Sequence, residues 1–193
     1  MNLVTPEWLV FAKVFLRHPW DVSSIFRTRT AVAKRLADRI REWRPQVIVE
    51  YGPATGSVSR AILAGGKLAA SSSLLLIEKT PEFVEYLRRT LHDPRVSIFH
   101  RSATDVLKVL AECGLGKADC IFSGIPLTLI PVDSADAILR NTREALNEDG
   151  LFVQYAFRRN NMEVLLRRHF QNVRSRTEIF NIPPLMVFEA RKN

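Results

Sequence analysis

The stretch from Val47 to Gly56 constrains the fold of this chain more than any other part of the sequence. A run of β-branched apolar residues leads into an acid, Glu50, and then into a turn that holds Gly52 and Gly56. A helical pattern begins directly afterwards at Ser57. Glycine lets the backbone approach a ligand with no Cβ in the way, and a helix that begins there points its free N–H groups into the same space. A strand, a glycine turn and a helix in this order predict a nucleotide-binding unit.

A second apolar run, from Ser73 to Glu78, also ends in a carboxylate about twenty residues after the turn. A carboxylate at this place suits the two hydroxyls of a ribose. A pair of glycines alone also occurs in plain strand-to-helix turns that bind nothing. The acid before the turn, the Pro53–Gly56 continuation and the second strand that ends in an acid together favour a ligand site.

Residues 50–56 read Glu-Tyr-Gly-Pro-Ala-Thr-Gly. They resemble the Glu-x-Gly-Pro-Gly-Thr-Gly signature of Rossmann-like methyltransferases that use S-adenosylmethionine (SAM). The sequence departs from that signature at Ala54, where many members have glycine. Because a side chain narrows the allowed backbone angles, we expect Ala54 to adopt a negative φ.

Apolar runs that alternate with helical patterns predict an α/β fold with a doubly wound, mostly parallel sheet. The methyltransferase resemblance implies seven strands, of which the last is inserted antiparallel. A helix is expected to begin at Pro81, and the segment 147–150 is expected to close a helix. The predicted strands are 47–50, 73–78, 95–100, 118–122, 151–157, 173–180 and 185–190, and the other predicted helices are 57–63, 106–110, 136–146 and 162–170.

Length and composition indicate one compact domain. A chain of 193 residues buries a sizeable core without disulfides or metals, and its apolar fraction of 47% is ordinary. Two cysteines do not form a disulfide framework, and Cys120 lies in an apolar run that predicts a core position. The sequence has no Cys/His cluster with metal-ligand spacing, so we expect no metal site.

The N-terminal part, residues 1–45, differs from the remainder in charge. It holds nine Lys and Arg residues against four Asp and Glu residues, a net +5 out of the total +8. We therefore expect residues 1–45 to form N-terminal helices that face a negatively charged partner, and residues 46–193 to form the SAM-binding domain. An oligomeric state does not follow from the sequence.

The segment 5–17 is expected to be a helix that is apolar around most of its circumference and carries Lys13 and Arg17 on one stripe. It is shorter than the roughly 20 residues that span a bilayer, and it lacks the pattern of a signal peptide. Two interpretations stay open: a helix packed against the domain, or one that lies in a membrane interface. A second helix, 31–43, carries a basic face.

Ligands of such sheets bind beyond the carboxyl ends of the strands. We expect the glycine turn to pass under the methionine part of SAM, with Glu50 pairing with its ammonium group and Glu78 binding the ribose. The side chain of Lys79 or Ile77 is expected to flank the adenine. The residues expected to contact the cofactor are Glu50, Tyr51, Gly52, Pro53, Ala54, Thr55, Gly56, Glu78, Lys79, Ser102, Ala103 and Ser123, and those expected to position the methyl acceptor are Ser123, Gly124, Ile125 and Pro126.

The chain as a whole resembles the bacterial phospholipid N-methyltransferases of the soluble, Rossmann-like type. The motifs are Phe-Leu-Arg-x-Pro at 15–19, the glycine turn, Ser-Gly-Ile-Pro-Leu at 123–127 and Asn-x-Pro-Pro at 181–184. The resemblance implies transfer of a methyl group from SAM to phosphatidylethanolamine and its methylated derivatives, which leaves S-adenosylhomocysteine. It also implies a cytoplasmic enzyme that docks peripherally on anionic membrane through residues 1–20. A Pro-Ser-Ser segment found in many members is replaced here by Arg27–Arg29.

Two other functions stay open at this point. The rRNA adenine N6-methyltransferases share the glycine turn, but they carry Asn-Leu-Pro-Tyr where this chain has Ser123 to Leu127. Their aromatic residue stacks on the target base, so nucleic acid is the less favoured partner. A non-catalytic binding protein with the same fold is the second alternative. His18, His100, Glu50 and solvent all stay candidates for the group that removes the proton from an aminolipid.

Overall fold

The computed structural model describes residues 38, 44–65, 68–156, 161–178 and 185–192. The strands are β1 (Val47–Tyr51), β2 (Ser73–Glu78), β3 (Val96–His100), β4 (Ala118–Ser123), β5 (Leu146–Ala156), β6 (Asn172–Glu178) and β7 (Leu185–Arg191). The helices are α4 (Ser57–Ala64), α5 (Pro81–Thr90), α6 (Val106–Glu112), α7 (Val132–Ala145) and α8 (Met162–Arg167), with a 3-10 turn, η1 (Ala103–Asp105), before α6.

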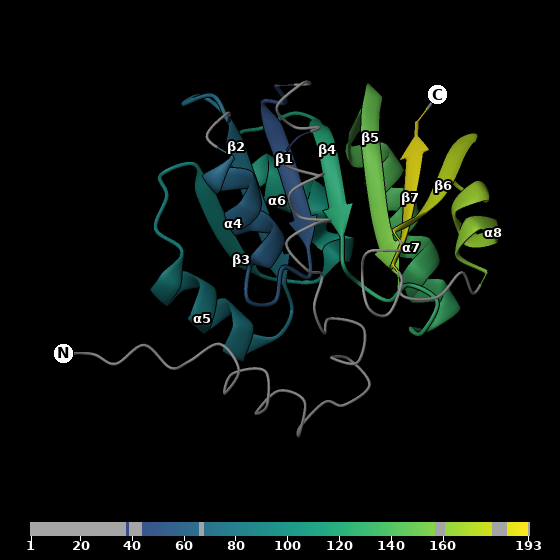
Figure 1. Ribbon diagram of the computed structural model, residues 1–193, viewed down its shortest axis with the longest axis horizontal. Coiled ribbons are helices and arrows are strands. Elements are labelled where there is room, and N and C mark those ends of the chain that lie inside the picture. The colour runs from purple at the N-terminus through teal and green to yellow at the C-terminus, as the bar shows by residue number, and fades with distance from the viewer. Residues whose placement is uncertain (1–37, 39–43, 66–67, 157–160, 179–184, 193) are drawn as a thin grey trace.

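The strands form one seven-stranded sheet in the order β3-β2-β1-β4-β5-β7-β6 (Figure 1). The pairs from β3 to β5 are all parallel, whereas β7 pairs antiparallel with both β5 and β6. The strand order turns back at β1, which has β2 on one side and β4 on the other. This confirms the prediction of a doubly wound sheet with the last strand inserted antiparallel.

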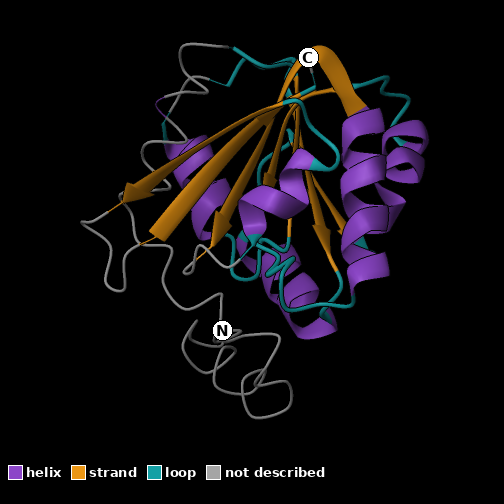
Figure 2. Cartoon of the chain, turned by 90° about the vertical axis from the view of Figure 1, so that its right-hand side faces the viewer, coloured by secondary structure: helices purple, strands orange, loops and turns teal. Residues whose placement is uncertain are grey.

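Helices cover both faces of the sheet (Figure 2). Apolar side chains of α6, α7 and α8 pack on one face, against alternate residues of β1 such as Val49 and Tyr51. The side chains of α4, together with Leu87 of α5, pack on the other face, where β1 contributes Ile48. Because both faces are buried, the central strands are apolar along nearly their whole length.

The start of β5 lies earlier than the sequence predicts. The segment 147–150, expected to close a helix, belongs to β5, and α7 begins at Val132 instead of Asp136. Leu146 pairs with Ala118, and the register then shifts so that Leu151 pairs with Cys120, which leaves residues 147–150 between the two pairings. The carboxylate of Asp119 accepts hydrogen bonds from the Val47 amide at 3.0 Å and from the Asn147 side-chain amide at 2.6 Å, and these bonds tie β1 and this part of β5 to β4. The predicted start of α5 at Pro81 is confirmed, and so is the core position of Cys120.

The prediction of a negative φ at Ala54 is wrong. Its φ is 52°, between Gly52 at 62° and Gly56 at 81°. A left-handed alanine costs roughly 1–2 kcal/mol relative to the right-handed region, and the methyl group is the smallest side chain that bears a Cβ. The turn is held in this conformation by hydrogen bonds that are formed with a distant strand, as described below.

Several predictions fall on residues outside the described part of the chain. These are the helices 5–17 and 31–43, His18, Arg27–Arg29, the docking segment 1–20 and the Asn-x-Pro-Pro motif at 181–184. Among the helices that the structure describes, none has the length and apolar character needed to cross a bilayer.

Candidate active site

A cavity of about 370 Å³ opens at the carboxyl ends of β1, β2, β3 and β4. The ends of β2 and β3 give it a polar wall, which includes Glu78, Lys79, Arg101 and Ser102. The segment between β4 and α7, together with the first half of α7, gives it an apolar wall. That wall contains Ile125, Pro126, Ile130, Pro131 and Ile138.

The glycine turn and the loop after β4 touch each other at the base of this cavity. The Gly124 amide donates to the Tyr51 carbonyl at 3.1 Å, and the Gly52 amide donates to the Ile77 carbonyl at 2.9 Å. A Cβ built on Gly52 would lie 3.2 Å from Cγ1 of Ile125, and one built on Gly124 would lie 3.4 Å from the Gly52 carbonyl oxygen. A Cβ on Gly124 would also lie 3.2 Å from Cε2 of Tyr155, and Gly52 has a φ of +62°. A side chain at either position would therefore be crowded, and at Gly52 the backbone would be strained as well.

Glu78 lines the cavity and also holds the glycine turn. Its Oε2 accepts from the Ala54 amide at 3.1 Å, and its Oε1 accepts from the Thr80 amide at 2.8 Å. Burial raises the pKa of this carboxyl, and the backbone hydrogen bonds from Thr80 and Ala54 oppose the rise. The carboxylate lines the cavity, so a ligand hydroxyl that enters there would meet it.

Glu50 lies beneath the turn, on the face of the sheet that α4 covers. It is 1% exposed, and the Ser59 hydroxyl donates to its Oε2 at 2.5 Å. Burial raises the pKa of Glu50 to about 7, although the hydrogen bond from Ser59 lowers it. Burial raises the pKa of the Tyr155 hydroxyl, and the charge of the nearby Glu50 raises this pKa further. This carboxyl is thus poised to change its charge near neutral pH.

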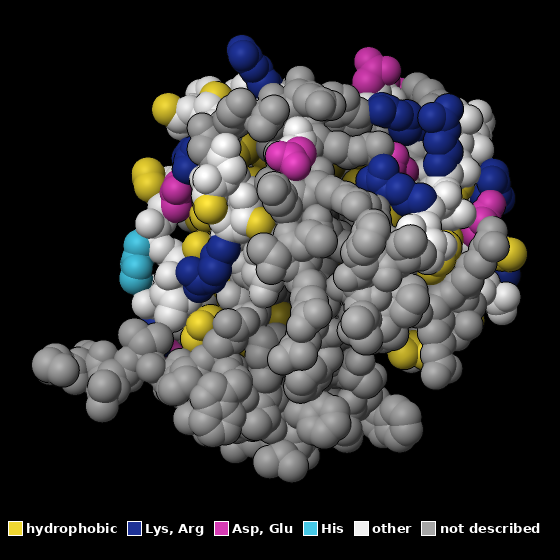
Figure 3. All heavy atoms as spheres, in the orientation of Figure 1, with side chains coloured by type: hydrophobic (Ala, Val, Ile, Leu, Met, Phe, Trp, Pro, Cys, Tyr) yellow, Lys and Arg dark blue, Asp and Glu magenta, His cyan; other side chains and the backbone are white. Residues whose placement is uncertain are grey.

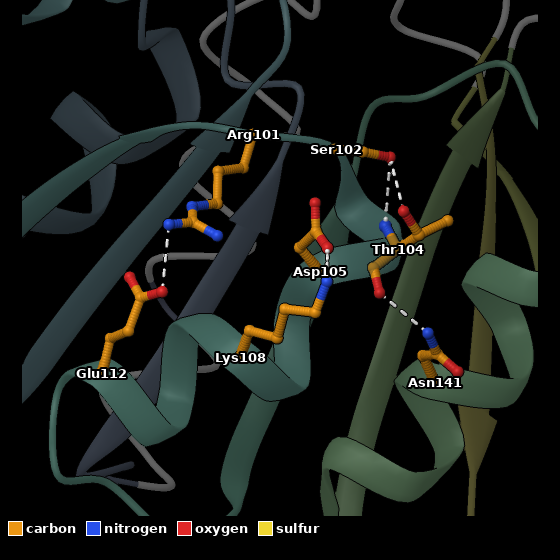
Figure 4. A network of polar contacts seen from close by, with 7 residues as sticks. All are labelled: Arg101, Ser102, Thr104, Asp105, Lys108, Glu112 and Asn141. Carbon is orange, nitrogen blue, oxygen red and sulfur yellow. Dashed lines mark hydrogen bonds and ion pairs between the residues drawn. The ribbon is translucent and has the colours of Figure 1, made fainter.

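The end of β3 supplies a second set of polar contacts (Figure 4). The Ser102 hydroxyl accepts from the amide of Thr104 at 3.3 Å and from its hydroxyl at 2.8 Å. The Thr104 carbonyl accepts from the Asn141 side-chain amide at 2.8 Å, which ties this end to α7. Arg101 pairs with Glu112 at 3.0 Å.

Gln154, a residue that the sequence analysis did not predict for the site, holds the loop after β4 through a hydrogen bond. Ser123 is fully buried and its hydroxyl oxygen accepts from the Ile125 amide at 3.3 Å. Gln154, beside Ser123 on β5, donates from Nε2 to the carbonyl oxygens of Ile125 and Tyr155, both at 2.9 Å. Its Oε1 is buried and has no hydrogen-bond partner among the residues that the structure describes. The sequence signal for Gln154 is a glutamine inside the otherwise apolar run 151–156.

The structure brings some of the predicted site residues to the cavity and leaves others behind the turn. The ones that line it are Gly52, Glu78, Lys79, Ser102, Ala103, Gly124, Ile125 and Pro126. Tyr51 faces away, where its hydroxyl lies 3.2 Å from that of Thr142 on α7. Glu50, Pro53, Ala54, Thr55, Gly56 and Ser123 are also absent from the lining. His100 bonds through its ring to the Lys79 carbonyl at 3.1 Å and does not line the cavity.

A second hollow, of about 590 Å³, lies at the opposite end of the sheet, where β7 ends. It is lined by basic side chains, among them Lys117, Arg140, Arg143 and Lys192. Lys and Arg side chains gather near that end of β7 in Figure 3. Although this hollow is the larger, it lacks the strand ends and the glycine turn at which ligands of this fold bind.

Comparison with known proteins agrees with this architecture. No family model matches the chain. An ornithine lipid N-methyltransferase from Singulisphaera acidiphila is 22% identical over 96% of this chain and 96% of its own length. An O-methyltransferase from Bacillus cereus, solved with S-adenosylhomocysteine (SAH), matches with a TM-score of 0.68 at 12% identity and covers 98% of this chain and 94% of that one.

The chain has the fold of the SAM-dependent methyltransferases. The fold alone leaves the transferred group open. A spermidine synthase from Thermotoga maritima matches with a TM-score of 0.59 at 17% identity over 78% of this chain, and the chain spans 54% of that enzyme's length. The residues that line the cavity therefore decide which reaction the fold supports.

Proposed function

We propose that the protein transfers a methyl group from SAM to the amine nitrogen of an aminolipid headgroup. The contact between the Gly52 turn and the Gly124 loop is the observation that carries this proposal. A donor above the turn and an acceptor at the loop would face each other across one cavity. Methyl transfer from a sulfonium depends mainly on such alignment, because the leaving group is already activated.

The residues at the cavity fit the donor. Gly52 presents backbone without a Cβ, and the carboxylate of Glu78 would meet the ribose hydroxyls at the cavity wall. Lys79, Ser102 and Ala103 would meet the adenine. SAM supplies an electrophilic methyl group, while the chain orients the donor and the amine and keeps water from the space between them. Glu50 is proposed to pair with the amino group of the donor from behind the turn.

An aminolipid is the acceptor that the other wall supports best. Ile125, Pro126 and Ile130 form an apolar surface next to the position of the amine, and a lipid carries apolar chains close to its headgroup. The relative from Singulisphaera acidiphila is named for an N-methylated lipid, and the motif at 123–127 resembles that of phospholipid N-methyltransferases. Phosphoethanolamine and ornithine headgroups both present a primary amine.

RNA methylation is the competing function. It requires an aromatic side chain that stacks on the extruded base. Here the corresponding position is Leu127, which is 1% exposed and is not part of the cavity lining. The buried position of Leu127 therefore argues against a nucleobase of RNA as the methyl acceptor.

Labelled SAM tests the proposal directly. Purified full-length protein is incubated with vesicles that contain phosphatidylethanolamine, with vesicles that contain an ornithine lipid, and with ribosomal RNA. Label is expected in a lipid fraction, and the two vesicle types identify the headgroup. Label in RNA with none in either lipid would refute the proposal.

Residues 1–20 are proposed to dock the enzyme on anionic membrane, because the N-terminal part carries most of the excess positive charge. Sedimentation with anionic vesicles would compare the full chain with one that lacks these residues. Weaker pelleting of the shortened chain is expected, and equal pelleting would remove this docking role.

A further inference from the structure

Large apolar side chains that face solvent concentrate beside the cavity. Within the described residues, the large hydrophobic side chains that stand out as exposed are Leu129 (64%), Val132 (61%) and Val164 (59%). Leu129 and Val132 enclose Ile130 and Pro131, which line the cavity. Residues 129–132 are called the apolar lip below. Single exposed apolar residues are common, but a pair at the mouth of a binding cavity calls for an explanation.

The backbone of the lip is held in place at both ends. The Leu129 amide donates to the Pro126 carbonyl at 2.8 Å, and the Ala135 amide donates to the Pro131 carbonyl at 3.0 Å. Leu127, just before the lip, is 1% exposed and packs in the core. Leu129 in the loop and Val132 at the start of α7 are therefore exposed on a backbone that hydrogen bonds hold on both sides.

The lip continues the apolar wall of the cavity outward. Opposite it stands the polar wall, with Lys79 and Arg101. A ligand that enters along the lip thus meets hydrocarbon on one side and cationic and polar groups on the other. This division suits a membrane lipid, whose headgroup is polar and whose chains stay in the bilayer.

We propose that the apolar lip inserts Leu129 and Val132 into the surface of a lipid bilayer, which brings the cavity mouth against the headgroups. This inference rests on the proposed function and deepens it by assigning a membrane-contacting surface within the methyltransferase domain. Apolar side chains that leave water at the bilayer boundary favour binding in proportion to the area buried. The acyl chains of the acceptor would run along Ile130 and Pro131 while its amine reaches Gly124.

Polar substitutions at the lip test the proposal. The double variant Leu129→Ser with Val132→Ser is compared with Val164→Ser, which replaces an equally exposed apolar side chain on α8, away from the cavity. Vesicles of phosphatidylcholine with phosphatidylglycerol and phosphatidylethanolamine serve as the probe, and bound protein is measured by sedimentation. The double variant is expected to bind about tenfold more weakly, and the control to bind within about twofold of the unmodified protein.

Two further measurements distinguish a failure of the lip proposal from a failure of the proposed function. The affinity for SAH, measured by calorimetry, should be the same for the unmodified protein and for the variants. Equal affinities would show that the variants are folded. Turnover of a short-chain phosphatidylethanolamine kept monomeric should be unchanged, whereas turnover on vesicles should fall for the double variant. If lipid is methylated and the double variant binds and turns over vesicles like the unmodified protein, the lip proposal is overturned and the function stands.

Other outcomes also decide between explanations. If the unmodified protein methylates neither lipid, the proposed function fails. The lip proposal is then tested only by whether the double variant binds vesicles more weakly than the unmodified protein. If the double variant changes the oligomeric state and leaves vesicle binding unaltered, the lip is a contact between protein copies and the membrane proposal is overturned. Gel filtration of the same samples supplies that measurement.

Discussion

The carboxylate of Glu78 accepts a hydrogen bond from the Ala54 amide, with 3.1 Å between Oε2 and the nitrogen. The end of β2 therefore fixes the conformation of the turn after β1. One residue thereby contacts the turn and also lines the cavity. Ala54 has a positive φ, 52°, in this arrangement.

Replacement Glu78→Gln is expected to weaken both roles. An amide nitrogen cannot accept a hydrogen bond, so either the Ala54 or the Thr80 amide loses its partner. Stability should fall by about 1–2 kcal/mol, and binding of SAH should weaken. Urea unfolding and calorimetry measure these effects. Glu85→Gln, on the exposed face of α5, is the matched control. Equal behaviour of the two variants would contradict the assignment.

Substitutions of three glycines separate backbone strain from crowding. Gly56 has a φ of +81°, and a Cβ there would lie 2.8 Å from Cδ2 of Leu87. Gly114 has a φ of +66°, but a Cβ there would meet no atom within 4 Å. Gly116 has no positive φ, and a Cβ there would also meet no atom within 4 Å. We expect Gly114→Ala to cost about 1–2 kcal/mol, Gly56→Ala to cost more, and Gly116→Ala to be close to neutral. Thermal unfolding gives the ranking. A neutral Gly56→Ala would show that the turn differs from the one described.

The stability of the protein should depend on the charge of Glu50. Burial raises the pKa of this group from 4.5 to about 7, so the folded state keeps a proton that the unfolded chain has lost. The free energy of unfolding contributed by Glu50 therefore falls as pH rises from 4.5 to about 7. Glu50→Gln removes this fall, which is on the order of 3 kcal/mol. Urea unfolding of both proteins at pH 5 and pH 8 measures it, and parallel pH profiles would contradict it.

The proposed pairing of Glu50 with the amino group of the donor predicts a second pH effect. An ionised carboxylate attracts a cation, so the affinity for SAH should rise as Glu50 loses its proton near pH 7. Glu50→Gln should bind more weakly and without this rise. Calorimetry between pH 6 and pH 8 compares the two proteins. An identical pH dependence would remove Glu50 from the donor site.

Gln154 is expected to affect turnover more than donor binding. It holds the Ile125 carbonyl at 2.9 Å and thereby positions the loop at which the acceptor would lie. Gln154→Leu should lower turnover about tenfold or more, because small displacements of an aligned acceptor are costly. SAH affinity should stay within about twofold. Gln171→Leu, at an exposed position, is the control. Full activity of Gln154→Leu would exclude a positioning role.

Local sequence determined the order of the elements and the place of the site. Apolar runs that lead into Glu50 and Glu78, and glycines between strand and helix, are short-range patterns that the chain carries whatever it packs against. Because parallel strands end at the same edge, these patterns also predicted that the residues at 52, 78, 102 and 124–126 would meet there.

Only the tertiary structure decided how each side chain is used. The left-handed Ala54 donates its amide to a carboxylate from β2, and the early start of β5 follows from the pairing of Leu146 with Ala118 of β4. The sequence did not indicate the roles of Gln154 and the apolar lip, because these roles depend on the position of β5 and α7 beside the loop after β4. Such features arise from contacts between segments far apart in the chain, and their energies exceed the local preferences that sequence patterns report.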